Sequence, residues 1–156
     1  MDKASIRRHV RTRLYALDDD KIRQKSSIIC ENVIASIDWE TLHRVSCYQS
    51  QPSLREVDTS QLIIYIRDNW PEIELDIVEP CKQAVLPHRQ YELIIVPVLG
   101  FDSEYNRLGR GGGWYDRFLS TQLAARTIGL AFDCQYINSI PVEDFDVELA
   151  EVFTES

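Results

Sequence analysis

The fold is decided by Leu93-Ile94-Ile95-Val96-Pro97-Val98-Leu99-Gly100-Phe101-Asp102 and, a few residues later, by Leu108-Gly109-Arg110-Gly111-Gly112-Gly113-Trp114-Tyr115-Asp116-Arg117-Phe118. The aliphatic run is typical of a buried parallel strand, whereas a helical pattern begins directly after the glycines. A glycine turn at a helix N-terminus presents backbone N–H groups, and these donors stabilise an anion together with the helix dipole. The stretch therefore predicts a strand, a glycine turn and a helix, with phosphate as the candidate ligand.

Hydrophobic periodicity on either side of this unit predicts alternating helices and strands. Within residues 3–17 the apolar side chains stand three or four apart, as in a helix with one buried face. Further helices are expected from about 18 to 37 and from 58 or 59 to 70, strands over 44–48, 73–78, 127–132 and 147–153, and a connection over 81–92. Such alternation implies right-handed crossovers and a three-layer, Rossmann-like α/β fold, in which helices cover both faces of a mostly parallel central sheet.

In a sheet of this kind, ligands bind beyond the carboxyl ends of the strands. We therefore expect the loop 49–58, the turn 99–116 and the segment after Phe132 to meet at one edge. Glu56 lies in the first of these loops, just before a helix start. Its carboxylate either complements the dipole of that helix or serves a ligand.

The composition bounds the class of protein. The chain has 156 residues, of which 44% are hydrophobic and 27% charged, and these values predict one globular domain over residues 1–156. No apolar run is long enough to cross a membrane and the first residues lack a signal-peptide core, so we expect a cytoplasmic protein without a membrane partner. Four cysteines without a CxxC pair suggest neither a zinc site nor a disulfide framework.

The charge distribution is uneven. A net charge of −8 argues against a nucleic-acid partner, since affinity for DNA or RNA comes largely from cations that neutralise phosphates. Lys3, Arg7 and Arg11 nevertheless form a cationic stripe at helical spacing near the start, and like charges so placed repel one another. The stripe is either a solvated face or one side of an anion site.

The glycine run itself is not diagnostic. It lacks the Lys-Ser/Thr pair of a Walker A loop and the G-x-G-x-x-G spacing of a dinucleotide fold, so in isolation it fits a flexible turn as well as a phosphate site. The longer string is far more specific. From Val96 to Asp102 and from Asn106 to Leu119 it closely resembles the signature of the 5-formyltetrahydrofolate cyclo-ligase family, approximately P-G-L-A-F-D…G-x-R-L-G-x-G-x-G-Y-Y-D-x-(F/Y)-L.

The resemblance extends to both ends of the chain. It includes Lys3-x-x-x-Arg7, Glu56-Val57-Asp58-Thr59, Ile128-Gly129-Leu130-Ala131-Phe132 with Gln135, and Pro141-Val142 with Asp146. It implies an ATP-dependent cyclo-ligase that uses Mg²⁺ and acts on 5-formyltetrahydrofolate. In the family the formyl oxygen attacks the γ-phosphate, N10 closes onto the activated carbon, and phosphate leaves to give 5,10-methenyltetrahydrofolate. Such phosphoryl transfer needs positioning and charge neutralisation more than covalent help from the protein.

The same resemblance implies the roles of individual residues. The nucleotide contacts are expected to be Lys3, Arg7, Arg107, Leu108, Gly109, Arg110, Gly111, Gly112, Gly113, Trp114 and Tyr115. The folate contacts are expected to be Glu56, Arg110 and Trp114, with Arg110 and Tyr115 as catalytic residues. Asp116 and Asp146 match the magnesium carboxylates of the family, a ligand type that suits Mg²⁺ beside phosphate oxygens.

Two departures from the family pattern bear on function. Trp114 stands where the family usually has Tyr, and only a helix end and one strand fit between Asn69 and Pro80, where the family usually carries a further strand and a loop that contacts folate. The alternative is therefore a nucleotide-binding module without folate turnover. A sugar-phosphate isomerase-like enzyme is disfavoured, because its chemistry needs a poised general base and no magnesium carboxylates. We expect a monomer.

Overall fold

Two helices begin the chain, α1 (Lys3–Tyr15) and α2 (Asp19–Ser36), in the computed structural model, which describes residues 1–80 and 85–156. Each helix starts at an Asp whose carboxylate accepts a hydrogen bond from the backbone N–H three residues later, which satisfies one of the unpaired donors of the first turn. Along α1 the apolar stripe of Ile6, Val10 and Leu14 is buried, as its spacing predicts. Its cationic residues therefore point away from the core.

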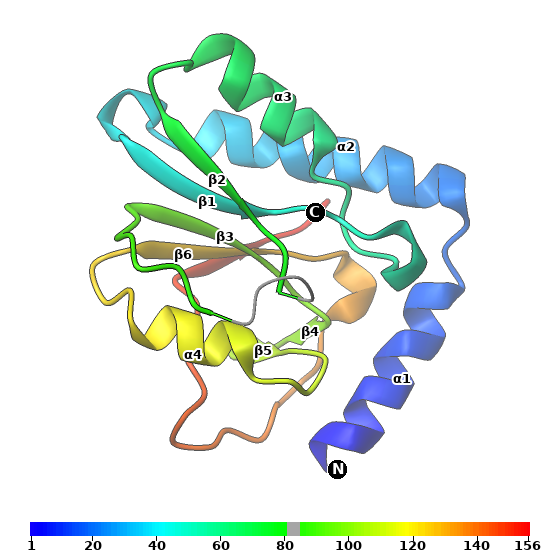
Figure 1. Ribbon diagram of the computed structural model, residues 1–156. Coiled ribbons are helices and arrows are strands. Elements are labelled where there is room, and N and C mark those ends of the chain that lie inside the picture. Colours follow the sequence, from blue (N-terminus) through cyan, green and yellow to red (C-terminus); the bar gives the residue numbers. More distant parts are fainter. Residues whose placement is uncertain (81–84) are drawn as a thin grey trace.

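A five-stranded parallel sheet forms the centre of the molecule, in the order β2-β1-β3-β6-β7 (Figure 1). Its strands are β1 (Arg44–Tyr48), β2 (Glu74–Val78), β3 (Leu93–Pro97), β6 (Arg126–Leu130) and β7 (Glu151–Phe153). The other helices are α3 (Ser60–Asn69) and α4 (Trp114–Ser120), with short 3₁₀ turns η1 (Trp39–Thr41), η2 (Pro52–Leu54) and η3 (Asp133–Gln135).

The central strand β3 is buried on both faces. Its alternate residues Leu93 and Ile95 belong to the apolar cluster under α1, α2 and α3, whereas Ile94 and Val96 belong to a second cluster with Phe118 of α4. Figure 1 shows α2 and α3 on one side of the sheet and α4 on the other. The expected three-layer α/β fold with a parallel sheet is therefore confirmed.

A small antiparallel hairpin of β4 (Gly100–Phe101) and β5 (Arg107–Leu108) follows β3. The buried carboxylate of Asp102 holds its turn, because it accepts hydrogen bonds from the backbone N–H groups of Glu104 and Asn106 at 3.0 and 3.1 Å. The hairpin was not expected, since two-residue strands carry no readable period. It carries the chain from the end of β3 to the glycine turn.

Several expected boundaries are corrected. The strand expected over 93–99 ends at Pro97, because the chain turns into β4, and the strand expected from 147 begins only at Glu151. The first helix ends at Tyr15, and the second occupies Asp19–Ser36 as its Asp cap predicts. Residues 85–92 contain neither helix nor strand, and 81–84 of the expected connection lie outside the described residues.

The thiols of Cys30, Cys47 and Cys134 are free. Cys81 lies outside the described residues. Within residues 1–80 and 85–156, no helix has the length and apolarity needed to cross a membrane.

Candidate functional site

A cavity of about 600 Å³ lies at the carboxyl ends of β1, β2 and β3. It is lined by α1, by the end of β1 and parts of the loop to residue 56, and by residues 78–80, 97–99, 107–116, 143, 145 and 146. The loop after β1 and the glycine turn thus meet where the parallel-sheet rule places them. Of the segment after Phe132, residues 143, 145 and 146 line the cavity, whereas the adjoining η3 does not.

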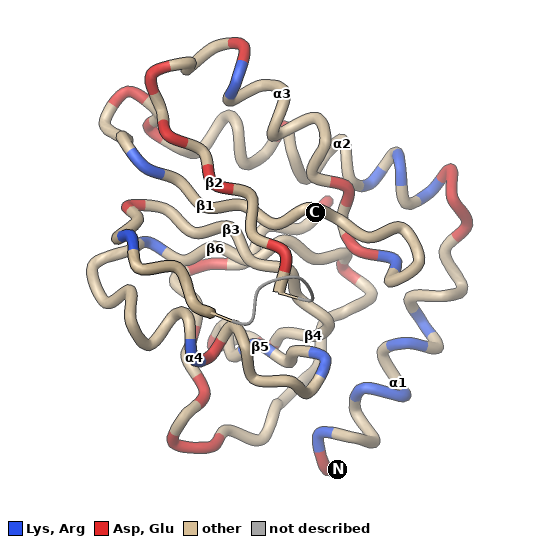
Figure 2. Tube along the Cα trace, viewed as in Figure 1, with Lys and Arg blue, Asp and Glu red and all other residues tan. Residues whose placement is uncertain are grey.

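Two cations of α1 reach this cavity. The ammonium of Lys3 lies 2.5 Å from Oδ2 of Asp146, and Nε of Arg7 donates a hydrogen bond of 2.8 Å to the backbone carbonyl of Gly109. Figure 2 shows basic residues along the length of α1, and Lys3 and Arg7 stand one helical turn apart on it. At these two positions the stripe contacts pocket residues and is therefore more than a solvated face.

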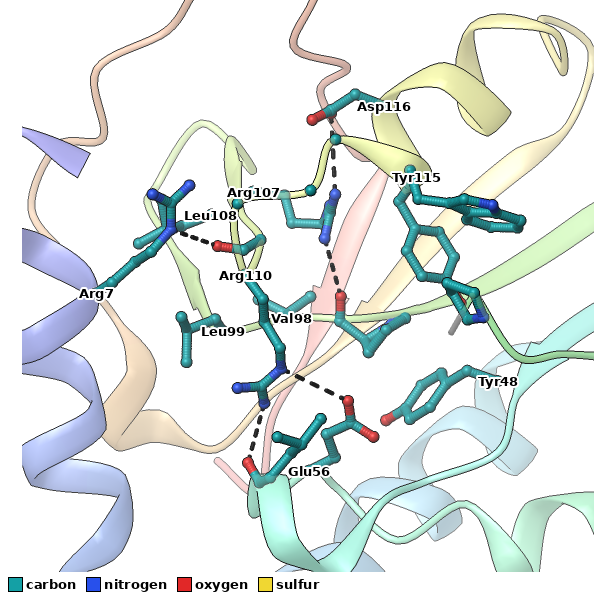
Figure 3. A pocket seen from close by; sticks show the side chains of 18 of the residues that line it. Arg7, Tyr48, Glu56, Val98, Leu99, Arg107, Leu108, Arg110, Tyr115 and Asp116 are labelled. Atoms are coloured by element: carbon teal, nitrogen blue, oxygen red, sulfur yellow. Dashed lines mark hydrogen bonds and ion pairs between the residues drawn. The ribbon is translucent and has the colours of Figure 1, made fainter. Parts of the chain in front are cut away.

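Arg107 forms the buried centre of the site. Its guanidinium donates to the carbonyl of Pro97 at 3.3 Å, lies 3.9 Å from Oδ1 of Asp116 and sits 5.4 Å from the ring centroid of Tyr115 (Figure 3). Burial lowers the pKa of Arg107, although the nearby carboxylate of Asp116 opposes this shift. The cation is thus held in a site of low dielectric, where its attraction for an anion is strongest.

Among the described residues, three buried side-chain polar atoms have no hydrogen-bond partner, and two of them lie at this cavity. Nε of Arg107 donates no hydrogen bond to the described residues, and the hydroxyl of Tyr115 neither donates nor accepts one. An unpaired buried donor costs free energy, so such atoms call for a ligand group or a water molecule. Both residues line the cavity.

Glu56 and Arg110 form the opposite wall. Nε of Arg110 lies 3.8 Å from Oε1 of Glu56, and Nη2 donates to the carbonyl of Leu54 at 3.0 Å (Figure 3). Burial raises the pKa of Glu56, against the hydrogen bond from the N–H of Gln51 and the charge of Arg110. At the start of α3, Asp58 accepts the bond from the N–H of Ser60, so Glu56 instead faces the cavity.

Asp116 and Asp146 both line the cavity, as expected, on the side of α1 and α4. Oδ1 of Asp116 accepts from the N–H of Val147 at 3.2 Å, and Oδ2 of Asp146 accepts from that of Glu143 at 2.9 Å. Burial raises the pKa of Asp146, but the bonds from Lys3 and Glu143 outweigh this and leave it lowered, so the carboxylate is ionised at neutral pH.

The chemistry of this donor set fits magnesium held with a nucleotide. Within the described ranges no group of three or more His, Cys, Asp and Glu residues forms a metal cage. Mg²⁺ usually binds through one or two carboxylates, several waters and substrate phosphates. The two carboxylates beside the glycine turn therefore provide as many protein ligands as Mg²⁺ usually takes when it binds together with phosphates.

The glycine turn is shaped by its backbone. Gly111 and Gly113 have φ angles of +114° and +70°, a region that favours glycine. A Cβ at Gly111 would also lie 3.7 Å from the guanidinium carbon of Arg7. The backbone of the turn therefore lies against Arg7 of α1. After the turn, the ring of Trp114 packs on the ring of Phe118, with 5.2 Å between the centroids.

All the residues assigned to the site from the sequence line this one cavity. Those not anticipated include Tyr48, Val78 and Pro97, which stand at the last positions of β1, β2 and β3. The rule that ligands bind beyond the carboxyl ends of parallel strands, applied to each strand end, would have found them. Phe145 and Glu143, in an irregular loop, carry no such signal.

Fold and cavity together define a doubly wound α/β protein with a ligand site of mixed charge, built around a glycine turn at the carboxyl edge of its sheet. Residues 52–155 match the model of the 5-formyltetrahydrofolate cyclo-ligase family, and the chain belongs to that family.

Relatives of known name support this assignment. The 5-formyltetrahydrofolate cyclo-ligase of Escherichia coli K12 is 42% identical over 74 residues, which are 46% of this chain and 41% of the relative. The 5-formyltetrahydrofolate cyclo-ligase of Mus musculus is 28% identical over 191 residues, covering 98% of this chain and 93% of the relative. That alignment is longer than the 156 residues of this chain, so the mouse relative has residues without a counterpart here.

A solved structure shares the fold. The 5,10-methenyltetrahydrofolate synthetase of Mycoplasma pneumoniae superposes with a TM-score of 0.81 over the whole of both chains, at 20% sequence identity. The likeness at this level of identity concerns the backbone architecture, and it agrees with the parallel sheet described above.

Proposed function

We propose that this chain catalyses the ATP- and Mg²⁺-dependent conversion of 5-formyltetrahydrofolate to 5,10-methenyltetrahydrofolate, with release of ADP and phosphate. The observation that carries the proposal is the pairing of two half-sites in one cavity. Arg7 and Arg107 lie with Asp116 on the glycine-turn side, and Glu56 and Arg110 form the opposite wall. A volume of about 600 Å³ is in the range of pockets that enclose small molecules, about 300–1,000 Å³.

The nucleotide half is suited to a triphosphate. Arg7 bonds the carbonyl of Gly109 in the glycine turn, Lys3 and Arg107 bring further positive charge to the same cavity, and backbone N–H groups of the turn would supply further donors. Asp116 and Asp146 are the residues that would hold Mg²⁺, which when bound neutralises phosphate charge. In this arrangement Leu108, Gly109, Gly111, Gly112, Gly113 and Trp114 complete the contacts to the nucleotide.

The transfer step requires that negative charge on the γ-phosphate be stabilised while the formyl oxygen attacks phosphorus and the bond to the ADP oxygen breaks. We assign this role to Arg110, a residue of the glycine turn that lines the cavity and whose Nε lies 3.8 Å from Oε1 of Glu56. Burial raises the pKa of Tyr115, so its hydroxyl stays protonated and acts as a hydrogen-bond donor and not as a base. N10 then closes onto the activated carbon and inorganic phosphate leaves.

Glu56 and Trp114 are assigned to the folate. A buried carboxylate accepts hydrogen bonds from the N–H groups of a pterin, and an indole supplies an aromatic surface for a ring. We expect the protein to act as a cytoplasmic monomer without a nucleic-acid partner, in line with its net charge of −8.

The activity is tested directly. Purified protein is mixed with 5-formyltetrahydrofolate, ATP and Mg²⁺, and methenyltetrahydrofolate is followed by its near-ultraviolet absorbance while ADP is measured separately. We expect the two products in equal amounts. Arg7→Met should raise the KM for ATP by about 10–100-fold, because one charge-assisted hydrogen bond contributes about 1.5–3 kcal/mol.

Arg8→Met is the matched control, since Arg8 lies on the same helix but is exposed, and its guanidinium donates a hydrogen bond to Ser5 of that helix. It should leave the KM unchanged. Absence of methenyltetrahydrofolate, together with ATP binding that still depends on Arg7, would contradict the enzyme and support a nucleotide-binding module in its place.

A further inference from the structure

The contact between Lys3 and Asp146 joins α1 to the loop that contains Asp146, on one side of the cavity. The Nζ–Oδ2 distance is 2.5 Å, and the two side chains are 18% and 14% exposed. The ammonium of Lys3 also lies over the ring of Phe145, 5.8 Å from its centroid. The pair is therefore a short, shielded interaction and differs from the loose ion pairs of a protein surface.

The carboxylate in this pair is also one of the two assigned to Mg²⁺. Its Oδ2 atom already accepts from Lys3 at 2.5 Å and from the N–H of Glu143 at 2.9 Å. A magnesium ion binds an oxygen at about 2.0–2.1 Å and carries two positive charges. A dication on either oxygen of this carboxylate would lie close to the ammonium held at Oδ2, and the two like charges repel each other, so metal binding favours release of Lys3.

The glycine turn lies within reach of the Lys3 ammonium once it leaves Asp146. Lys3 and Arg7 stand one turn apart on α1, and Arg7 already contacts the carbonyl of Gly109 in the glycine turn. A lysine side chain is a point charge on a flexible stem, so it can swing towards the turn while α1 stays in place. Phosphates bound at that turn would receive it.

The neighbouring pair behaves differently. Arg107 and Asp116 are 3.9 Å apart, and the guanidinium is buried and bonded to the carbonyl of Pro97. Arg107 is thus anchored, whereas Lys3 is the cation of the two pairs that is free to exchange its partner.

We propose that Lys3 is an internal counterion of the magnesium site, which occupies Asp146 in the ligand-free protein and moves to the nucleotide phosphates when Mg²⁺ arrives with them. This inference rests on the proposed assignment of Asp146 to the metal. Its consequence is that free metal binds poorly, while metal and nucleotide bind together.

The test uses Mn²⁺ as the probe, titrated into nucleotide-free protein and followed by the electron paramagnetic resonance of the free ion. Lys3→Met should bind Mn²⁺ at least about fivefold more tightly than the unchanged protein, in the range of ordinary coupling between sites, 5–150-fold. The same variant should bind ADP in the presence of Mg²⁺ more weakly, because the phosphates lose a cation. Lys3→Gln serves as a second variant, and circular dichroism verifies that both are folded.

Lys25→Met is the control. It removes an ammonium that lies 2.6 Å from Glu155, outside the cavity, and changes the net charge by the same amount. Its Mn²⁺ affinity should stay at the unchanged value. An equal gain in Lys25→Met, or no gain in either Lys3 variant, would overturn the exchange.

The Mn²⁺-binding test does not depend on whether the protein catalyses the proposed reaction. A protein that makes methenyltetrahydrofolate but shows no gain of Mn²⁺ affinity in the Lys3 variants refutes the counterion and leaves the enzyme intact. A protein that shows the gain but makes no product supports the counterion and refutes the proposed reaction.

Discussion

Glu56 keeps a carboxylate that is 7% exposed in the wall of the cavity. The N–H of Gln51 donates to it at 2.9 Å, and Arg110 lies 3.8 Å away. Tyr48 and Tyr115 also interact with its charge. Because burial is the largest influence on its pKa, Glu56 is a residue whose placement favours ligand binding over stability.

Glu56→Gln should make the unfolding free energy less dependent on pH. A carboxyl whose pKa is raised in the folded state binds its proton more readily there than in the unfolded chain, so its contribution to stability is lost as pH rises from 4.5 through the folded pKa. The amide keeps the shape and can still accept from Gln51. Urea unfolding from pH 4 to pH 7 measures the difference in unfolding free energy between Glu56→Gln and the unchanged protein. We expect this difference to shift in favour of the variant as pH rises. The loss of a charge partner for Arg110 reduces its size. Parallel pH profiles would contradict this.

Individual site residues could be predicted from the sequence, but their partners could not. The signature around the glycine turn identifies residues 107–116, and all of them line the cavity. That Lys3 would pair with Asp146, 143 positions away, follows from side-chain positions that no local pattern encodes. The contact between Arg110 and Glu56 is hidden for the same reason.

At the level of elements, β6 passes through a crowded part of the sheet. Its Gly129 has no room for a side chain, since an added Cβ would lie 2.6 Å from Cγ2 of Val98 and 2.8 Å from Cδ1 of Leu149. The strand pairs with β3 on one side and β7 on the other. Glycine here permits the close approach of two segments that border the site.

Gly129→Ala should lower the unfolding free energy by about 1–3 kcal/mol, the usual range for overpacking a core. Chemical denaturation monitored by circular dichroism measures the change. Gly112→Ala is the control, because apart from its chain neighbours no atom of the described residues lies within 4 Å of the added Cβ, and the variant should stay within about 0.5 kcal/mol of the unchanged protein. Equal losses in the two variants would show that crowding is not the cause.

Long elements could be predicted and short ones could not. α2 and β1 lie where periodicity and the Asp cap place them, because burial of one face dictates their pattern. The β4–β5 hairpin depends on hydrogen bonds to the side chain of Asp102, including one at 3.1 Å from the N–H of the distant Ile140. Such a turn is fixed by a tertiary contact that leaves no periodic trace.

At the scale of the molecule, the cavity joins segments from near both ends of the chain, from α1 to residues 143–146. The parallel orientation of the strands and the helices on both faces could be predicted, since alternation of helices and strands implies right-handed crossovers. The depth of the cavity and its balance of charges could not, because they depend on how loops from five places meet.

Saturating ADP with Mg²⁺ should raise the melting temperature. A ligand at 100 times its Kd adds about 2.7 kcal/mol of stability, which corresponds to about 5–11 °C in a chain of this size. Differential scanning fluorimetry measures the shift, and AMP with Mg²⁺ is the control because it lacks the second phosphate for the cations to hold. Shifts of equal size with AMP and ADP would contradict the phosphate contacts assigned to the glycine turn.

The contact between Lys3 and Asp146 also bears on how the protein is made. These residues are separated by 143 positions, so at about 5–20 residues per second a ribosome adds Asp146 about 7–30 s after Lys3. Shortly before Asp146 is added, the nascent chain already contains Arg7, Arg107 and the glycine turn. Lys3 still has no carboxylate to pair with at that stage. The cavity becomes complete only after Glu143, Phe145 and Asp146 have been added, so ligand capture cannot guide the folding of the segments made before them.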